Sequence, residues 1–486
     1  MPRRDARGGA VRGRRQRPAP HAGHGGARLA RHPALHPPSL RPARRAALGA
    51  PRVCGRRAAR AGPAGRGASA HPAVRGARAP GGGGAVSGSS GDVIVVGAGP
   101  AGAATAILLA ERGLHVVVLD RARLPRPKIC GEYLSPETAR ILDRLGVLKV
   151  LDAAGAAPLL GMRLTAPDGT VVTGTYGPVA SWRPYRGHAM AVSRAVLDGA
   201  LADRLRALPV DFREGVRVTD LLRQADRVVG VEARDADGRP HALRAPLVVG
   251  ADGRASVVAQ RLGCRRRHRL RRMAVVTYVE GVPGCRDRGE IFVDPPDYAI
   301  LNPLDGQRAN LSVVVPLSHA VPWSDRLEDF LFARVKQLPH LARRLAGAVR
   351  VAPVQALGPL AHGVRPPRSG GVLLVGDAAG FYDPLTGEGV FSALRGAELA
   401  AETAARAVRA GDCSVAALAE YARARRAVFA GKARVTRALQ LIVRRRRLAN
   451  LTARLLTRRP ALLDLLMGVV GDYAPPRALL GALVLR

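Results

Sequence analysis

The sequence predicts an α/β fold in which a parallel sheet with covering helices is interrupted by an antiparallel sheet and followed by a helical segment. Three observations support this fold class. Short β-branched runs lead into glycine-rich turns, residues 271–357 alternate strands with turn signals, and residues 432–470 have a helical pattern. A chain of 486 residues allows two or three domains and a large core.

The first element is a βαβ unit. Residues 92–96 form an apolar, β-branched run typical of a buried parallel strand, and residues 103–112 have helical composition. A second apolar run, 115–119, ends at Asp120. The turn before the helix is Gly97-Ala-Gly-Pro-Ala-Gly102, which matches the fingerprint of a Rossmann-type dinucleotide-binding domain in the context that this fingerprint requires.

Each glycine of this turn has a physical reason. Gly97 permits the tight turn, Gly99 lets the backbone approach a pyrophosphate, and Gly102 lets the helix pack closely on the strand. The helix N-terminus offers free amide donors to phosphates, and the Asp120 carboxylate is placed to accept hydrogen bonds from ribose hydroxyls. The candidate cofactor-binding residues of the unit are Gly97, Gly99, Pro100, Ala101, Gly102, Asp120 and Arg121.

Two distant segments repeat the pattern of a strand that ends in an aspartate. Residues 247–256 deliver Asp252, and residues 372–381 deliver Asp377, after which residues 383–389 lead into a long Ala-rich helix. Taken alone, each aspartate could cap a strand-to-helix turn.

Together with the first turn, these segments resemble the FAD-dependent oxidoreductases of the para-hydroxybenzoate hydroxylase type, and more closely the geranylgeranyl reductase family. The resemblance runs from about Asp92 to about Gly411. It implies FAD as cofactor and Asp377 as the residue that holds its ribityl chain. It also implies that the turn at Gly387 and Gly389, with Val390 opening the helix, faces the pyrimidine edge of the flavin. A helix N-terminus there would stabilise the anionic reduced ring.

Two further segments match this family. Residues 126–131 (Arg-Pro-Lys-Ile-Cys-Gly) resemble the segment that runs toward the isoalloxazine, and residues 191–198 resemble an R-x-x-x-D element in which Arg194 lies against FAD. Arg194 could instead be a solvated charge in the first turn of a helix. Cys130 is the candidate catalytic residue, and the alternative is a small buried hydrophobic residue.

The chain also departs from the family pattern. Reductases of lipids usually carry Cys-Gly-Gly where this sequence has Cys-Gly-Glu, and their Y-x-W-x-F-P element is here residues 298–303 without Trp or Phe. The Cys-Gly-Glu pattern resembles oxidoreductases of polyketide and other natural-product pathways, whose reactions include hydroxylation. An antiparallel sheet between residues 271 and 357, with a hairpin at Asp305-Gly306, would roof the flavin over an apolar ligand.

Composition limits the partners. The net charge is +40, but 73 of the 77 basic residues are Arg, a ratio typical of GC-rich coding DNA rather than of a phosphate-binding surface, because either cation contacts phosphate. With aromatic residues at 3%, we expect no specific nucleic-acid partner. Five widely spaced cysteines without a CxxC pair indicate neither a disulfide framework nor a metal site, so we expect a cytoplasmic protein.

Residues 1–90 contain 19 Arg, one acidic residue and no Phe, Tyr, Trp, Ile or Lys, so this leader is not expected to fold alone. It could be an organellar transit peptide, a nucleic-acid arm, an unstructured tail, or translated upstream DNA with true initiation near Val86. We favour the last two. The expected divisions are a leader (1–90), FAD-binding segments (91–190, 191–265 and 361–411), a substrate-binding sheet (266–360) and C-terminal helices (412–486).

The basic helical pattern of residues 432–470 has two interpretations. It could lie on an anionic membrane as a peripheral contact, or it could pack on the sheet with its arginines in water.

The expected function is that of an FAD-dependent oxidoreductase that accepts electrons from NAD(P)H and reduces or hydroxylates a lipophilic small molecule. Because no second G-x-G-x-x-G follows the first, NAD(P)H would bind transiently in a cleft. The alternatives are a flavoenzyme without net redox change, such as a cyclase, and a nucleic-acid-binding protein.

Overall fold

The computed structural model describes residues 91–484, so the expectations about residues 1–90 lie outside the described part of the chain. Its first layer is a parallel sheet with the strand order β21-β12-β1-β2-β8. These strands are β1 (Val93–Val96), β2 (Val116–Asp120), β8 (Val210–Glu214), β12 (Leu247–Gly250) and β21 (Val372–Leu374). The predicted βαβ unit forms the centre of this sheet.

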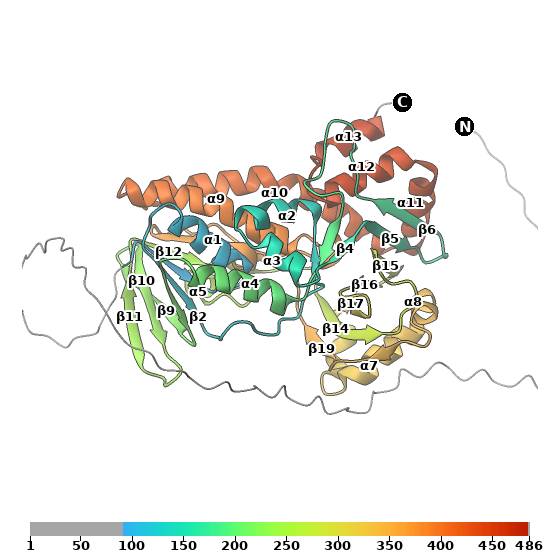
Figure 1. The fold of residues 1–486 in the computed structure, drawn as a ribbon, viewed down its shortest axis with the longest axis horizontal. Helices are drawn as coiled ribbons and strands as arrows, with labels where there is room; N and C mark the ends of the chain where they lie inside the picture. Colours follow the sequence, from blue (N-terminus) through green and yellow to red (C-terminus); the bar gives the residue numbers. More distant parts are fainter. Residues whose placement is uncertain (1–90, 485–486) are drawn as a thin grey trace, which may run out of the picture. The chain divides into compact units, whose positions relative to one another are not determined.

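Alternate residues of β1 face two different layers. Val93 and Val95 contribute to the core under three helices, α1 (Pro100–Ala110), α4 (Arg194–Arg206) and α9 (Gly389–Arg409). Ile94 and Val96 pack on a three-stranded antiparallel sheet, β9 (Arg217–Gln224), β10 (Arg227–Arg234) and β11 (Pro240–Arg244). Both faces of the parallel sheet are therefore covered (Figure 1), which explains the uninterrupted apolar runs of its strands.

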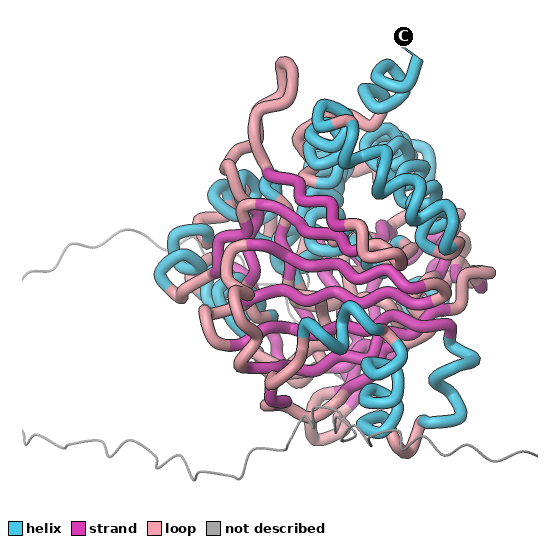
Figure 2. Tube along the Cα trace, turned by 90° about the vertical axis from the view of Figure 1, so that its right-hand side faces the viewer, coloured by secondary structure: helices cyan, strands magenta, loops and turns pink. Residues whose placement is uncertain are grey.

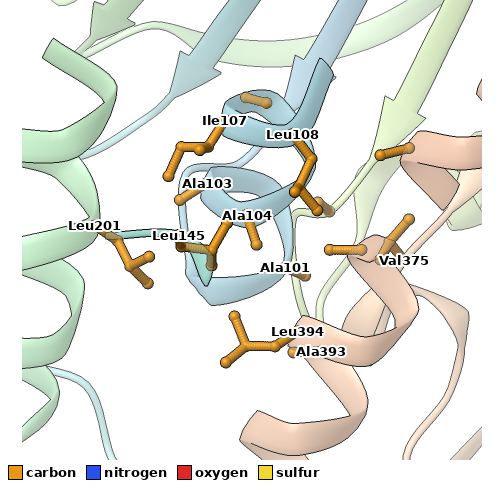
Figure 3. Packing of buried hydrophobic residues seen from close by; sticks show 14 of the residues in the cluster. Ala101, Ala103, Ala104, Ile107, Leu108, Leu145, Leu201, Val375, Ala393 and Leu394 are labelled. Atoms are coloured by element: carbon orange, nitrogen blue, oxygen red, sulfur yellow. The ribbon is translucent and has the colours of Figure 1, made fainter. Parts of the chain in front are cut away.

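Helix α1 is buried along its whole length because it lies between two other helices and the sheet. Figure 3 shows Ala103 turned toward Leu201 of α4, and Ala101 close to Ala393 and Leu394 of α9. Small residues are needed on α1 because the neighbouring helices approach it from both sides.

The second large element is an eight-stranded sheet, whose strands run side by side in Figure 2. Its antiparallel centre lies in the predicted range 271–357 and has the predicted hairpin; its strands are β14 (Arg272–Glu280), β15 (Arg288–Asp294), β16 (Asp297–Pro303) and β17 (Arg308–Pro316). β18 (Val349–Arg350) and β19 (Gln355–Leu357) both pair with β14. The sheet also takes β5 (Gly161–Thr165) and β6 (Val171–Thr175), which lie within the range 91–190 expected for the FAD-binding part.

The two faces of this sheet have different neighbours. Its outer face packs on α7 (Leu327–Gln337) and α8 (Pro339–Arg344). Its inner face packs on Ile129, Phe381 and Leu385 and on the long helix α10 (Val415–Val443). The inner face is thus turned toward the segments that the sequence placed beside the cofactor.

The remaining elements connect or extend these layers. They are β3 (Tyr133–Leu134), α2 (Pro136–Arg144), α3 (Leu148–Ala153), β4 (Ala157–Leu159), β7 (Ala189–Ala191), α5 (Val257–Arg261), β13 (Arg265–Arg267), α6 (Leu317–Ala320), β20 (His362–Val364), α11 (Arg446–Arg458), α12 (Pro460–Val470) and α13 (Arg477–Val484), with short 3₁₀ turns η1 (Val321–Trp323), η2 (Gly376–Ala379) and η3 (Pro384–Thr386). Among the residues described, no helix is both long and apolar enough to cross a bilayer.

Candidate functional site

The candidate site lies where parallel strands end. Strands β1, β2, β12 and β21 are parallel neighbours, so their carboxyl ends meet at one edge of the sheet. At this edge stand the glycine turn after β1, Asp120 at the end of β2, Asp252 after β12 and Asp377 after β21. Segments far apart in the sequence are therefore brought together at the place where open α/β sheets bind their ligands.

The three glycines of the turn meet different surroundings. Gly97 has φ +98°, and a Cβ on it would lie 2.7 Å from the carbonyl oxygen of Ala251. A Cβ on Gly102 would lie 1.7 Å from the carbonyl oxygen of Gly97. A Cβ on Gly99 would meet nothing within 4 Å. Two of the glycines are thus required by the fold itself, while the third borders open space that a pyrophosphate could enter.

Helix α1 begins at this open space with free amides. Pro100 is its first residue, Ala101 follows, and no side chain caps the N-terminus at Gly99. The first turn carries no acidic residue that would repel an anion. Backbone donors at a helix start, together with the positive end of the helix dipole, are suited to phosphate.

Asp120 is bound to the same turn. One carboxylate oxygen, Oδ2, accepts a hydrogen bond from the backbone N–H of Ala98 at 2.8 Å, and Oδ1 accepts one from the N–H of Ala122 at 2.9 Å. The charge partner of Asp120 is Arg126, whose Nη2 lies 3.8 Å from Oδ2. Arg121, a candidate from the sequence, is exposed beside it.

The two other aspartates differ in role. Oδ2 of Asp252 accepts hydrogen bonds from the backbone N–H groups of Val257 (2.6 Å) and Val258 (3.3 Å), so Asp252 binds the first amides of α5, whose N-cap is Ser256. Burial raises the pKa of Asp252. Asp377 lies in η2, where its carbonyl oxygen pairs with Nε2 of His362 at 2.8 Å. The negative charge of its carboxylate acts to raise the pKa of Lys128.

Lys128 is a half-buried cation that the candidate set from the sequence did not include. Burial, and then the charge of Arg194, lower its pKa, while Asp377 and Asp198 act in the opposite direction. It belongs to the segment 126–131 that the resemblance singled out, so this family motif was the feature of the sequence that could have identified Lys128 as a site residue.

Arg194 is not a solvated charge. Its guanidinium makes two hydrogen bonds of 2.9 Å to the Asp198 carboxylate, and the pair is almost completely buried. Burial acts to lower the pKa of Arg194, but the carboxylate beside it raises that pKa above its ordinary value. Cys130 lies close enough to interact with the guanidinium, and its side chain is partly exposed.

The turn before α9 packs on the same site. Gly387 has φ +64°, and a Cβ there would lie 2.3 Å from the ring of Tyr133. Gly389 is the first residue of α9 and Val390 is buried behind it. The ring of Tyr133 therefore packs directly against the turn that leads into this helix.

Hydrogen bonds of Asp383 join the loop that carries Gly387 to β16 and α10. The Oδ1 atom of Asp383 accepts hydrogen bonds from the Tyr298 hydroxyl (2.6 Å), from Nε2 of Gln440 (2.6 Å) and from the N–H of Leu385 (3.0 Å). Burial raises the pKa of Asp383. Within residues 91–484, no group of His, Cys, Asp and Glu side chains could hold a metal ion.

These features suit an elongated dinucleotide such as FAD. An uncapped helix start beside open space fits a pyrophosphate, a buried carboxylate at the end of β2 fits a ribose, and α9 offers a second helix start at Gly389. The apolar inner face of the large sheet packs on Ile129, Phe381 and Leu385, which lie in or next to the candidate segments.

Comparison with known proteins gives a consistent picture. A family model for the FAD binding domain matches residues 90–436. Digeranylgeranylglycerophospholipid reductase of Methanosarcina mazei is 28% identical over 333 residues, which are 65% of this chain and 76% of that protein. Conditioned medium factor receptor 1 of Dictyostelium discoideum is 28% identical over 337 residues, 65% of this chain. These cover 63% of the receptor, so the chain spans less than two thirds of that relative's length.

A solved structure extends the likeness. The myxobacterial chondrochloren halogenase, described as a new variant of FAD-dependent halogenases, superposes with a TM-score of 0.63 at 29% identity. The superposition covers 69% of this chain and 79% of the halogenase.

Proposed function

The chain belongs to the FAD binding domain family, and on this basis we propose that it takes electrons from NAD(P)H to reduce or hydroxylate a lipophilic small molecule, isoprenoid or polyketide-like. Its family and relatives make it an FAD-dependent oxidoreductase, as the sequence predicted. The electron donor, the reaction and the residues that perform it belong to the proposal.

In this proposal the cofactor lies along the carboxyl edge of the parallel sheet. Bound FAD would supply the redox chemistry, by accepting a hydride from NAD(P)H and passing electrons to the substrate or to oxygen. The amides at the start of α1 bind the pyrophosphate, Asp120 the ribose and Asp377 the ribityl chain. The other proposed cofactor-binding residues are Gly97, Gly99, Pro100, Ala101, Gly102, Arg121, Arg194, Gly387, Gly389 and Val390, with Cys130 as the proposed catalytic side chain.

The observation that carries the proposed substrate class is the inner face of the large sheet. Ile291, Val293, Ile300 and Val314 are buried in an apolar cluster, where they pack with Ile129 and Phe381 of the candidate segments and with α10. We infer from these apolar surroundings that a ligand bound beside them is apolar and that water is excluded from the reacting atoms.

Reduction and hydroxylation differ in their need for oxygen. Reduction of a double bond adds a hydride and a proton, whereas hydroxylation inserts one oxygen atom of O₂ and releases the other as water. The chain should therefore be incubated with NADPH and candidate substrates, a polyprenyl lipid and an aromatic polyketide, with and without oxygen, and the product mass measured. A gain of two hydrogens without oxygen shows a reductase. A gain of one oxygen atom that requires O₂ shows a monooxygenase, the alternative that the Cys-Gly-Glu pattern favours. Absence of either product with every candidate would contradict the proposal.

We also propose a cytoplasmic protein with peripheral membrane contact through α11. Leu448, Leu451 and Leu455 recur at helical spacing on this helix and are exposed, Leu451 by 64%. Exposed arginines, Arg447 and Arg458, flank them. An apolar stripe between cations is complementary to an anionic lipid surface.

Sedimentation with vesicles tests this contact. The chain should bind phosphatidylglycerol vesicles more than phosphatidylcholine vesicles, and Leu451→Ser should weaken the binding. Val150→Ser is the matched control, because Val150 on α3 is also exposed, by 52%. Equal binding to both kinds of vesicle, or an equal loss in the control, would contradict the proposed contact.

A further inference from the structure

The loop that carries Cys130 is held against the inner face of the large sheet by two asparagines. Nδ2 of Asn310 donates to the carbonyl oxygen of Cys130 at 2.9 Å, and Nδ2 of Asn302 donates to the carbonyl oxygen of Gly131 at 2.8 Å. The two asparagines are register partners on β16 and β17. The polar end of this sheet face therefore binds the loop itself.

Glu132, the next residue, completes the attachment. Its Oε1 accepts hydrogen bonds from the backbone N–H of Arg194 and from the Tyr278 hydroxyl, both at 2.9 Å. Its Oε2 accepts one from Nδ2 of Asn310 at 3.1 Å. The carboxylate thus joins three separate parts of the fold: the loop, the start of α4 and the large sheet.

The backbone of Glu132 indicates that these contacts are needed. Its φ of +56° is in the left-handed region, where a glycine would rest without strain. Its side chain is also 2% exposed, and burial of a carboxylate is unfavourable unless donors satisfy it. Burial raises the pKa of Glu132, whereas its donors and the charge of Arg194 act in the opposite direction. A glycine at this position would avoid the strain but could not make the three hydrogen bonds of the carboxylate.

The attachment bears on the candidate catalytic side chain. The sulfur of Cys130 accepts a hydrogen bond from the backbone N–H of Glu132 at 3.4 Å, and the Glu132 carboxylate binds the backbone of Arg194, whose charge the thiol also affects. Tyr278 lies near both Cys130 and Glu132. The backbone on both sides of Gly131 is therefore fixed, and with it the direction of the thiol.

We propose that Glu132 is a positioning residue of the oxidoreductase: together with Tyr278, Asn302 and Asn310 it holds the Cys130 loop so that the thiol faces Arg194 in the flavin site. This rests on the proposed placement of Cys130 and Arg194 beside FAD. The role of Glu132 is exerted through the loop and requires no contact with the substrate.

Alkylation of Cys130 in the full chain with FAD bound tests the proposal. The rate with iodoacetamide is followed by mass spectrometry of the Cys130 peptide, and the flavin absorption spectrum is recorded alongside. In Glu132→Gly the loop loses all three hydrogen bonds of the carboxylate, and we expect alkylation to be about fivefold faster or more, with an altered flavin spectrum. Glu132→Gln retains acceptors for Arg194 and Tyr278 and should lie between this variant and the natural chain.

Controls separate positioning from a purely structural role. Glu398→Gln removes a half-buried carboxylate paired with Arg140 on a different helix, and should change neither readout. If Glu132→Gly does not fold, Tyr278→Phe and Asn302→Ala each remove one donor and should give smaller increases of the same kind.

The proposal is overturned if the Glu132 variants lower the melting temperature but leave both the alkylation rate and the flavin spectrum unchanged. A failure of the underlying assignment looks different. If added FAD does not slow alkylation of Cys130 in the natural chain, Cys130 lies outside the flavin site and the proposed function loses that residue.

Discussion

Two alanine substitutions in the glycine turn separate what the fold needs from what the cofactor needs. Gly99 and Gly102 lie in the same turn, but an added Cβ meets nothing within 4 Å at Gly99 and lies 1.7 Å from a backbone oxygen at Gly102. The backbone of Gly99 has φ −69° and ψ −179°, which alanine adopts without strain. Only the substitution at Gly102 should therefore disturb the protein in the absence of FAD.

The magnitudes follow from these contacts. Contacts of a real Cβ essentially never fall below 3.0 Å, so Gly102→Ala must displace the backbone by more than an ångström. Overpacking a core lowers the free energy of unfolding by about 1–3 kcal/mol. Because the clashing atom is a backbone carbonyl oxygen that cannot rotate away, we expect Gly102→Ala to cost about 3 kcal/mol or more. For Gly99→Ala, the loss of one charge-assisted hydrogen bond to a displaced pyrophosphate is about 1.5–3 kcal/mol. That corresponds to an increase in the Kd for FAD of about ten- to a hundredfold.

The assay compares the two variants with the natural chain. Urea unfolding of the FAD-free proteins measures stability, and quenching of flavin fluorescence measures the Kd for FAD. We expect Gly99→Ala to keep the unfolding midpoint and lose affinity, and Gly102→Ala to lose both. Normal affinity in Gly99→Ala, or an equal loss of stability in both variants, would refute the assignment of the open space to the pyrophosphate.

Three further changes should have measurable effects. Gly387→Ala places a Cβ 2.3 Å from the ring of Tyr133 at a residue with φ +64°. We therefore expect its free energy of unfolding, measured in urea, to fall by about 2–3 kcal/mol. Adding Tyr133→Leu to the same chain should make this fall smaller. Asp198→Asn leaves the buried charge of Arg194 unpaired and should cost about 3–5 kcal/mol; a cost near zero would show that the pair is open to water. Burial raises the pKa of Asp383, so its contribution to stability is present below the ordinary carboxyl pKa and lost as the pH rises through the raised value. The melting temperature should fall over that range, and Asp383→Asn should flatten the fall; an unchanged slope would contradict the burial of this acid.

Local patterns explain why much of the fold could be predicted. The strand at Val93, the turn from Gly97 to Gly102 and the hairpin at Asp305 each depend on neighbours in the sequence. The pairing of β5 with β15 joins residues more than a hundred positions apart, and no periodicity encodes it.

The attachment of the Cys130 loop shows the same limit at the candidate site. Both departures from the pattern of lipid reductases were visible in the sequence, at Glu132 and at Asn302. Only the structure shows that both residues hold the Cys130 loop in place, because the hydrogen-bond partners of Glu132 come from α4, β14 and β17, which are distant in the sequence. The positive φ of Glu132 is likewise a property of the folded backbone.

The C-terminal pattern left two interpretations open because it treated residues 432–470 as one helix. The helical pattern is interrupted at Arg444 and Arg445, where α10 ends and α11 has not yet begun. Leu439 and Ile442 before the break pack on the large sheet, whereas Leu451 after it is exposed. Each interpretation therefore has support in a different helix.

The central claim is that the carboxyl edge of the parallel sheet holds one FAD that NAD(P)H reduces. Titration of the FAD-free chain with FAD, followed by anaerobic addition of NADPH or NADH, tests it most directly. We expect one FAD per chain and bleaching of the bound flavin by one of the two donors. A folded chain that binds no FAD would contradict the assignment of the site, and bound FAD that neither donor reduces would contradict the proposed electron source.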